Sequence, residues 1–251
     1  MSIELLVLGS SGSGPSRAVP ASGYLVRSGG ATVLLEAGTG VFMALAAEMD
    51  PVDLDAVVVS HVHADHSADL IGLVHYLAYR RPRDRPLPVH APGGVVARTA
   101  AYLDAGPDHA MFSVVAPSDL ADGASVAIGG ATWRFAATTH SVPTVAVRIE
   151  HGGGALAYSA DTGLDGGFPA LAAGADLVLC EAGLTGPRGS GTYPFHLSGA
   201  EAGSLGAAAG AGRLVLTHLA PNLPADEVRA GAEGTFGGPV DVARPGLRIT
   251  L

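Results

Sequence analysis

The chain has 251 residues, a formal net charge of −9, and 48% hydrophobic against 15% charged residues. This balance excludes a disordered chain, and the length suffices for one large domain with a sizeable buried core or for two small domains. All of its basic residues are arginine. An acidic chain of this kind does not fit a protein that grips a long nucleic acid, because such proteins normally carry a basic face.

The chain carries one cysteine, which excludes an intramolecular disulfide. Its N-terminus, Met1-Ser-Ile-Glu-Leu, lacks the basic start and the long apolar stretch of a signal peptide. No run reaches the ~18 apolar residues that suggest a membrane span. We therefore expect a cytoplasmic protein that does not associate with a membrane.

Short apolar runs between Gly- and Ser-rich turns dominate the first half, and such runs are typical of strands. The predicted strands are Ile3–Leu8, Tyr24–Arg27, Thr32–Glu36, Ala56–Ser60, Pro88–Ala91 and Phe112–Ala116. The predicted helices are Thr39–Met49, a segment capped by Ser67 that runs to Tyr79, and Val95–Leu103. The apolar strand that begins at Ala56 is of the kind buried on both faces.

The second half repeats this pattern. Its predicted strands are Ala124–Ile128, Thr132–Thr138, Val145–Glu150, Ala155–Ser159, Leu177–Glu181, Leu214–Thr217 and Leu247–Thr250. Its predicted helices are Ser198–Ala209, capped by Ser198, and the short Ala225–Ala230. Because helices fall between groups of strands in both halves, we predict an α+β fold, a four-layer αββα sandwich. No low-complexity linker divides the halves, so residues 1–251 are predicted to form a single domain.

A histidine-rich segment directly follows the buried strand that begins at Ala56. It holds His61, His63, Asp65 and His66 within six positions. Neutral imidazole and carboxylate are the nitrogen and oxygen ligands that zinc takes. A surface histidine tract would not follow an apolar strand and open a helix, so the segment predicts a metal site.

Further metal-capable residues follow other predicted strands. His140 comes after the strand Thr132–Thr138, Asp161 after Ala155–Ser159, and His218 after Leu214–Thr217. Functional side chains gather at strand ends in α/β architectures. Each residue alone is compatible with an ordinary loop, but their repeated placement favours convergence on the histidine-rich segment.

The ordered series from His61 to His218 resembles the metal ligands of the metallo-β-lactamase superfamily. The turns Leu8-Gly9-Ser10 and Ala37-Gly38-Thr39-Gly40 are similar to its N-terminal signature. One departure is Glu36, where the family usually has an aspartate that orients the metal loop without binding metal. The resemblance implies the αββα fold and the following metal ligands: His61, His63, Asp65, His66, His140, Asp161 and His218.

A narrower resemblance is to the RNase Z-like branch. His140-Ser-Val-Pro143, Cys180-Glu181-Ala182 and Phe195-His196-Leu197-Ser198 are similar to three of its motifs. The resemblance implies that His196 donates a proton and that Glu181 orients it. We therefore take His196, Glu181 and the metal-binding Asp65 as the catalytic candidates.

These residues together predict a di-zinc hydrolase. His61, His63 and His140 would hold one ion, and Asp65, His66 and His218 the other, with Asp161 as the bridge. Two zinc ions polarise a phosphoryl oxygen and lower the pKa of bound water toward ~7, so that hydroxide attacks at neutral pH. Mn²⁺ or Fe can occupy such sites, so the sequence leaves the identity of the metal open.

The predicted substrate is a small or cyclic phosphodiester. The tRNA-processing enzymes of the branch carry a long Gly- and Pro-rich arm between the equivalents of Asp161 and His218, whereas Gly183–Pro194 is too short for it and is expected to form a mobile flap. The acidic charge also argues against a long nucleic acid as partner. Many relatives are homodimers, which leaves a homodimer open here.

Two other functions remain open. A lactone, thioester or β-lactam hydrolase would use the same metal ligands, but it would not require His196 beside Glu181. A catalytically silent metal-binding accessory protein would also keep the fold, although its ligand set would not need to stay intact. A cluster formed by Arg80, Arg81, Arg83 and Arg85 is interpreted as a solvated loop or as an anion-steering patch.

Overall fold

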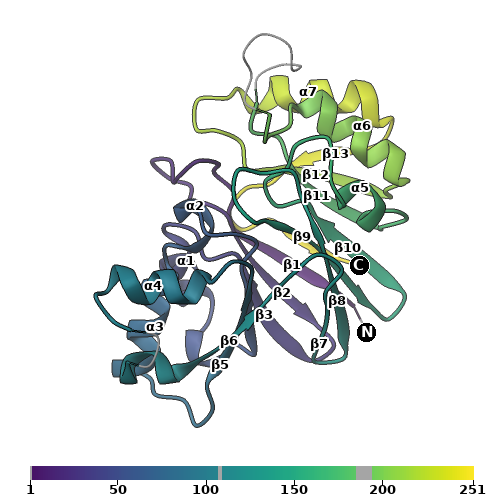
Figure 1. The fold of residues 1–251 in the computed structure, drawn as a ribbon. Helices are drawn as coiled ribbons and strands as arrows, with labels where there is room; N and C mark the ends of the chain where they lie inside the picture. The colour runs from purple at the N-terminus through teal and green to yellow at the C-terminus, as the bar shows by residue number, and fades with distance from the viewer. Residues whose placement is uncertain (1, 107–108, 185–193) are drawn as a thin grey trace.

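The computed structural model describes residues 2–106, 109–184 and 194–251. Two mixed sheets pack face to face in it, with helices on both outer sides (Figure 1). The predicted four-layer αββα sandwich is therefore confirmed. Most of the segment for which a flap is expected, residues 185–193, lies outside the described residues.

The first sheet contains, in spatial order, β14 (Arg248–Thr250), β1 (Glu4–Gly9), β2 (Gly23–Ser28), β3 (Ala31–Leu35), β4 (Ala56–Val58), β5 (Leu87–Ala91) and β6 (Val115–Asp119). Strands β3 to β6 run parallel to one another, while β14, β1, β2 and β3 alternate in direction. The antiparallel pair of β1 and β14 brings the two ends of the chain together (Figure 1).

The second sheet contains, in spatial order, β13 (Val240–Val242), β12 (Arg213–Thr217), β11 (Leu177–Glu181), β10 (Gly154–Tyr158), β9 (Val145–His151), β8 (Ala131–Ala137) and β7 (Ser125–Ile128). Strands β10 to β13 are parallel, and β7 to β10 are antiparallel. The carboxyl ends of β10, β11 and β12 consequently lie at one edge of this sheet, where parallel sheets collect functional groups.

Helices cover the outer face of each sheet (Figure 1). The first sheet is flanked by α1 (Val41–Glu48), α2 (Ala64–Ser67), α3 (Leu70–Tyr79) and α4 (Val95–Tyr102), with the short 3₁₀ helices η1 (Pro51–Asp53) and η2 (Ala110–Val114). The second sheet is covered by α5 (Phe168–Leu171), α6 (Gly199–Ala209) and α7 (Ala225–Phe236). Among the described residues, no helix has the length and apolar character needed to cross a membrane.

The layers define the core. One cluster of buried side chains lies between the sheets, built around Trp133, Tyr24 and Tyr158, and it takes residues from both halves of the chain. Two further clusters lie between each sheet and its helices. The core between the sheets is therefore shared by both halves of the chain, while the single domain over residues 1–251 stays a prediction.

Three predicted elements differ from those observed. Ser67 does not cap the long helix: it ends α2, and its hydroxyl donates to the carbonyls of Val62 and His63 at 2.9 and 3.0 Å. The predicted strand Phe112–Ala116 begins as a 3₁₀ helix and becomes extended only at Val115. The last predicted helix starts at Ala225 as expected but continues to Phe236.

Ser198 does cap its helix. Its side chain accepts from the backbone N–H of Glu201, and the Glu201 carboxylate accepts from the backbone N–H of Ser198. This reciprocal pair is a capping box, which satisfies two backbone donors at the start of α6. The start of α6 is thereby fixed close behind His196.

Candidate metal centre

The histidine-rich segment forms a tight turn at the carboxyl end of β4. The extended backbone after β4 carries His61 and His63, and α2 carries Asp65 and His66. The two hydrogen bonds of the Ser67 hydroxyl close the turn. The hydroxyl that the sequence suggested as a helix cap therefore holds the segment in shape.

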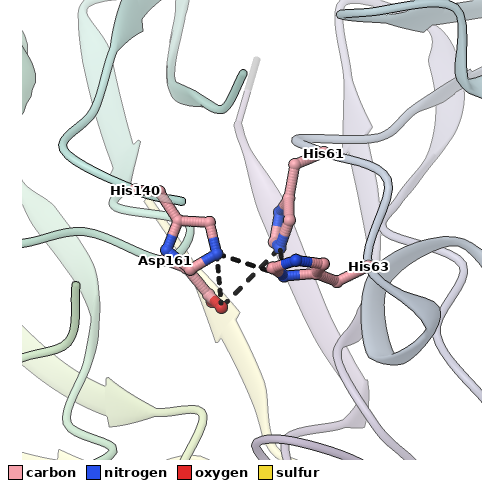
Figure 2. A group of neighbouring side chains, drawn as sticks. All are labelled: His61, His63, His140 and Asp161. Carbon is pink, nitrogen blue, oxygen red and sulfur yellow. Dashed lines mark hydrogen bonds and ion pairs between the residues drawn. The ribbon is translucent and has the colours of Figure 1, made fainter. Parts of the chain in front are cut away.

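Three imidazoles and a carboxylate converge in the first of two clusters, which we call the first half-site: His61, His63, His140 and Asp161 (Figure 2). The Nε2 atoms of His61 and His140 each lie 3.1 Å from Nδ1 of His63. One ligand atom from each of the four residues lies within 4.8 Å of the others. His140 comes from the loop after β8, so the half-site joins the two sheets.

The second half-site contains Asp65, His66, Asp161 and His218, and their ligand atoms also lie within 4.8 Å of one another. His218 follows β12, and its Nε2 is 3.2 Å from Oδ2 of Asp65. His66 is fully buried and His218 nearly so. This half-site also takes side chains from both sheets.

Asp161 lies between the half-sites. Its Oδ2 is 3.7 Å from Nε2 of His61 and 3.8 Å from Nε2 of His140. Its Oδ1 is 3.1 Å from Nε2 of His66 and 3.3 Å from Nε2 of His218. Each oxygen of this buried carboxylate thus faces a different half-site.

The donor set fits metal ions. Nε2 of His66 and Oδ1 of Asp161 are buried and lie 3.1 Å apart, yet neither makes a hydrogen bond to a described residue. Buried polar atoms are normally satisfied, so atoms that converge without partners need another occupant. Imidazole nitrogens and carboxylate oxygens are ligands for zinc and related divalent ions.

Burial and charge act differently on the two half-sites. Burial lowers the pKa of His140 from 6.5 to about 4, and burial followed by the neighbouring charge of His66 lowers the pKa of His61 well below that value. Burial also opposes protonation of His66 and His218, but Asp161 and a second carboxylate outweigh it and raise the pKa of both. The second carboxylate is Glu36 for His66 and Asp65 for His218.

Glu36, whose role the sequence leaves open, contacts the metal loop from the side opposite the ligands. Its carboxylate is fully buried, with Oε1 at 3.4 Å from Nδ1 of His66 and Oε2 accepting from the backbone N–H of Ser60 at 3.0 Å. The hydroxyl of Ser60 is 2.9 Å from Nδ1 of His61. Partners of this kind fix the ring orientation of a ligand histidine. Ser60 carries no separate signal in the sequence, because it looks like the last residue of a buried strand.

Backbone contacts hold the loop against neighbouring turns. The N–H of Ser22 donates to the carbonyl of Asp65 at 3.1 Å, and that of Ala37 donates to the carbonyl of His66 at 2.8 Å. Gly38 passes so close that a Cβ there would collide with the Asp65 carbonyl, and Gly12 approaches His218 in the same way. Only glycine permits these approaches, which explains Gly38 in the turn Ala37-Gly38-Thr39-Gly40 and Gly12 just after the turn Leu8-Gly9-Ser10.

His196 and Glu181 are paired beside the second half-site, as the resemblance to the RNase Z-like branch implies. Nδ1 of His196 lies 3.0 and 3.2 Å from the two oxygens of Glu181, and its ring stacks on His218 with centroids 5.4 Å apart. Burial works against protonation of His196, but the hydrogen bond and charge of Glu181 outweigh it and raise its pKa. The imidazole is thereby oriented and biased toward carrying a proton.

The carboxylate of Glu181 also accepts hydrogen bonds from the backbone of three loops. Its Oε1 accepts from the backbone N–H of Thr162 at 2.7 Å, and its Oε2 accepts from those of Gly183 and Leu197 at 3.3 Å each. Glu181, His196 and His218 are close enough to resemble a third metal cluster. Because the carboxylate already accepts these hydrogen bonds, we interpret the group as an orienting network.

The arginine cluster lies at the end of α3 remote from the metal loop. Arg83 donates to the carbonyls of Val52 and Leu54, and Arg81 pairs with Asp50 at 3.0 Å. These two arginines attach their loop to η1. The contacts favour a structural loop over a patch that steers anions into the site.

Comparisons with known proteins agree with this geometry. A sequence profile of the β-lactamase superfamily domain matches residues 11–219. An uncharacterised protein of Mycobacterium tuberculosis is 36% identical and aligns over 96% of this chain and 89% of its own length. A protein named ribonuclease Z, from Mycolicibacterium paratuberculosis, is 31% identical over 96% of this chain and 94% of its own.

A solved structure extends the comparison. The metallo-β-lactamase fold protein YhfI of Bacillus subtilis superposes with a TM-score of 0.86 at 28% identity, over 99% of both chains. Its sequence is named a probable metallo-hydrolase. These likenesses, together with the His/Asp clusters, confirm the predicted family, fold and enzyme class. The chain belongs to the β-lactamase superfamily, as a metallo-hydrolase with RNase Z-like relatives.

Proposed function

We propose that this chain is a phosphodiesterase that cleaves a small or cyclic phosphodiester with the help of two metal ions. His61, His63 and His140 would hold one ion and Asp65, His66 and His218 the other, with Asp161 facing both half-sites. Bound zinc, or Mn²⁺ or iron in its place, supplies Lewis acidity and a water whose pKa is lowered toward ~7.

The paired His196 and Glu181 carry the proposal. Phosphodiester cleavage expels an alkoxide, and this leaving oxygen needs a proton as the P–O bond breaks. Glu181 engages Nδ1 of His196 at 3.0 Å, so proton transfer runs through Nε2. The raised pKa of His196 keeps the imidazole protonated further into the neutral range. A thioester expels a thiolate, a weaker base that leaves with less need for a proton. A lactone expels an alkoxide, as a phosphodiester does, so direct assay of both substrates separates these two activities.

The size of the substrate follows from the chain around the site. Only a short segment separates Leu184 from Pro194, which leaves no room for a long substrate-gripping arm. The net charge of −9 disfavours a polyanion that spreads over the surface. The site therefore suits a compact diester, and cyclic nucleotides and cyclic sugar phosphates are compounds of this kind.

A substrate panel tests the proposal. The zinc-loaded protein is assayed on bis-p-nitrophenyl phosphate, a 3′,5′-cyclic nucleotide, a lactone and a thioester, with a chelator-treated sample as control. We expect metal-dependent cleavage of the phosphodiesters at least tenfold faster than of the lactone or thioester. Fast lactone turnover without phosphodiester cleavage would assign the chain to the rival hydrolases. A metal-loaded protein silent on all four would support an accessory role.

A further inference from the structure

Two tyrosines, Tyr24 and Tyr158, lie buried between the sheets behind the second half-site. Tyr24 comes from β2 of the first sheet and Tyr158 from β10 of the second, and neither is more than 1% exposed. Their ring centroids are 5.3 Å apart. A phenylalanine would fill the same space without burying a hydroxyl, which is costly unless the hydroxyl has a partner.

The hydroxyl of Tyr24 reaches across to the opposite sheet. It shares a hydrogen bond of 2.6 Å with the hydroxyl of Thr217, the last residue of β12. The next residue is His218, whose φ of 56° places it in the left-handed region. A non-glycine residue holds this conformation only where the surrounding structure imposes it. The Tyr24–Thr217 bond anchors the chain at the residue before this strained ligand.

Tyr158 makes the reciprocal approach from the second sheet to the first. The charge of Glu36 is, after burial, the largest cause that raises the pKa of Tyr158, so this phenol stays neutral beside the carboxylate. The phenol oxygen and Oε1 of Glu36 are both fully buried, and neither makes a hydrogen bond to a described residue, so each lacks a partner of the kind that the other offers. Oε1 is also the atom 3.4 Å from Nδ1 of His66.

Glu36 is itself held in a strained backbone conformation, with a φ of 67° at the end of β3. Its side chain is one methylene longer than the aspartate usual at this position. A longer side chain has more rotamers to lose, so a neighbour that fixes its carboxylate improves the alignment of His66. Tyr158 is the described residue placed to do this.

We propose that the pairs Tyr24–Thr217 and Tyr158–Glu36 form a cross-sheet brace that sets the metal affinity of the second half-site. The inference rests on the metal centre of the proposed function, but not on its substrate. The four residues are positioning residues, since they reach the metal through His218 and His66. The first half-site is not expected to depend on the brace.

The test measures zinc affinity in full-length variants that lose one hydroxyl each: Tyr24→Phe, Thr217→Val and Tyr158→Phe. Tyr76→Phe is the matched control, because its hydroxyl donates to Asp50 at 2.9 Å on the outer face of the first sheet. Metal-depleted protein is titrated with Zn²⁺ against a chromophoric chelator. Zinc anomalous scattering from crystals grown with limiting zinc shows which half-site fills.

In each brace variant we expect one of the two zinc ions to bind about 10- to 100-fold more weakly, as is typical when the partner of a ligand is removed. In the brace variants zinc should be missing from the second half-site, whereas the first half-site should keep its zinc affinity. Tyr76→Phe should bind both ions normally. The double variant Tyr24→Phe/Thr217→Val should lose no more than the worse single variant, since the two hydroxyls act through one bond.

Unchanged affinity for both ions in the brace variants would overturn the inference, and so would equal weakening at both half-sites. If Tyr24→Phe does not fold, Thr217→Val and Tyr158→Phe decide the question. A wild-type protein that binds two zinc ions yet cleaves no phosphodiester would contradict the proposed substrate class and leave this test intact. A wild-type protein that binds no zinc would overturn both.

Discussion

The two half-sites draw ligands from both sheets, but the protein supports them differently. In the first, His61 is backed by the Ser60 hydroxyl at 2.9 Å, and the histidines approach one another directly. In the second, buried groups from both sheets stand behind the ligands, with Glu36 near His66 and the Tyr24–Thr217 bond next to His218.

The two half-sites also differ in how readily their histidines bind a metal ion at neutral pH. In the metal-free protein the pKa of His61 and of His140 is lowered, so these rings are neutral and ready to bind an ion at neutral pH. The pKa of His66 and of His218 is raised, so an ion there must displace protons. The first half-site is thus ready to bind, whereas the second depends on the groups behind it.

The largest expected effect comes from the residue common to both half-sites. Asp161→Ala removes the carboxylate that faces His61 and His140 with one oxygen and His66 and His218 with the other. We expect zinc affinity to fall at both half-sites and turnover to drop on the order of 10³-fold, equivalent to about 4 kcal/mol. Metal analysis after dialysis measures this, with the exposed Asp165→Ala as control. Retention of two zinc ions would disprove the bridging role.

His196→Ala separates proton donation from metal binding. We expect the variant to keep both zinc ions and to lose about 10²- to 10⁴-fold in phosphodiester turnover, the usual contribution of a positioned acid. The loss should be smaller for a substrate with a p-nitrophenolate leaving group, which needs less protonation than an alkoxide. The exposed His75→Ala serves as control. Wild-type turnover in His196→Ala would remove His196 from the mechanism.

A pair of substitutions sharpens the comparison of the half-sites. Glu36→Gln should weaken zinc at the second half-site about 10- to 100-fold, and Ser60→Ala should weaken it at the first by the smaller part of that range, since only one hydroxyl contact is lost. Chelator competition gives both affinities. If each substitution weakened both ions equally, the half-sites would not be independently supported.

The smallest effect that we expect is a difference between the half-sites in how zinc affinity changes with pH. The pKa of His66 and of His218 is raised, so both imidazoles carry a proton at low pH and lose it as the pH rises through their pKa. The proton competes with zinc for the imidazole nitrogen. Affinity of the second half-site should therefore keep rising as the pH is raised above about 6.5, where that of the first no longer depends on proton release. Titrations in buffers of different ionisation enthalpy count the released protons. Equal slopes would contradict the assignment.

The sequence predicts the fold and the convergence of the His and Asp side chains, because both leave strong local patterns. A dense cluster after a buried strand marks the metal loop, and single residues after later strands mark the remaining ligands. The Glu181–His196 pair, by contrast, was visible only through resemblance, since its partners are 15 residues apart and lie in different elements.

The sequence reveals few of the residues that support the metal ligands from behind. Tyr24 and Tyr158 occur in apolar strands and look like ordinary core residues, and nothing local indicates that their hydroxyls meet the opposite sheet. Ser67 was misassigned because a serine before a helix usually caps it, whereas here it bonds back to the turn. Such contacts depend on how distant segments pack.

The most direct measurement is a zinc anomalous diffraction map of the protein crystallised with excess zinc. We predict two peaks per chain, one among His61, His63 and His140 and the other among Asp65, His66 and His218, with Asp161 contacting both. A map with no peak at these residues, or with a single ion that all of them share, would contradict the two-metal centre.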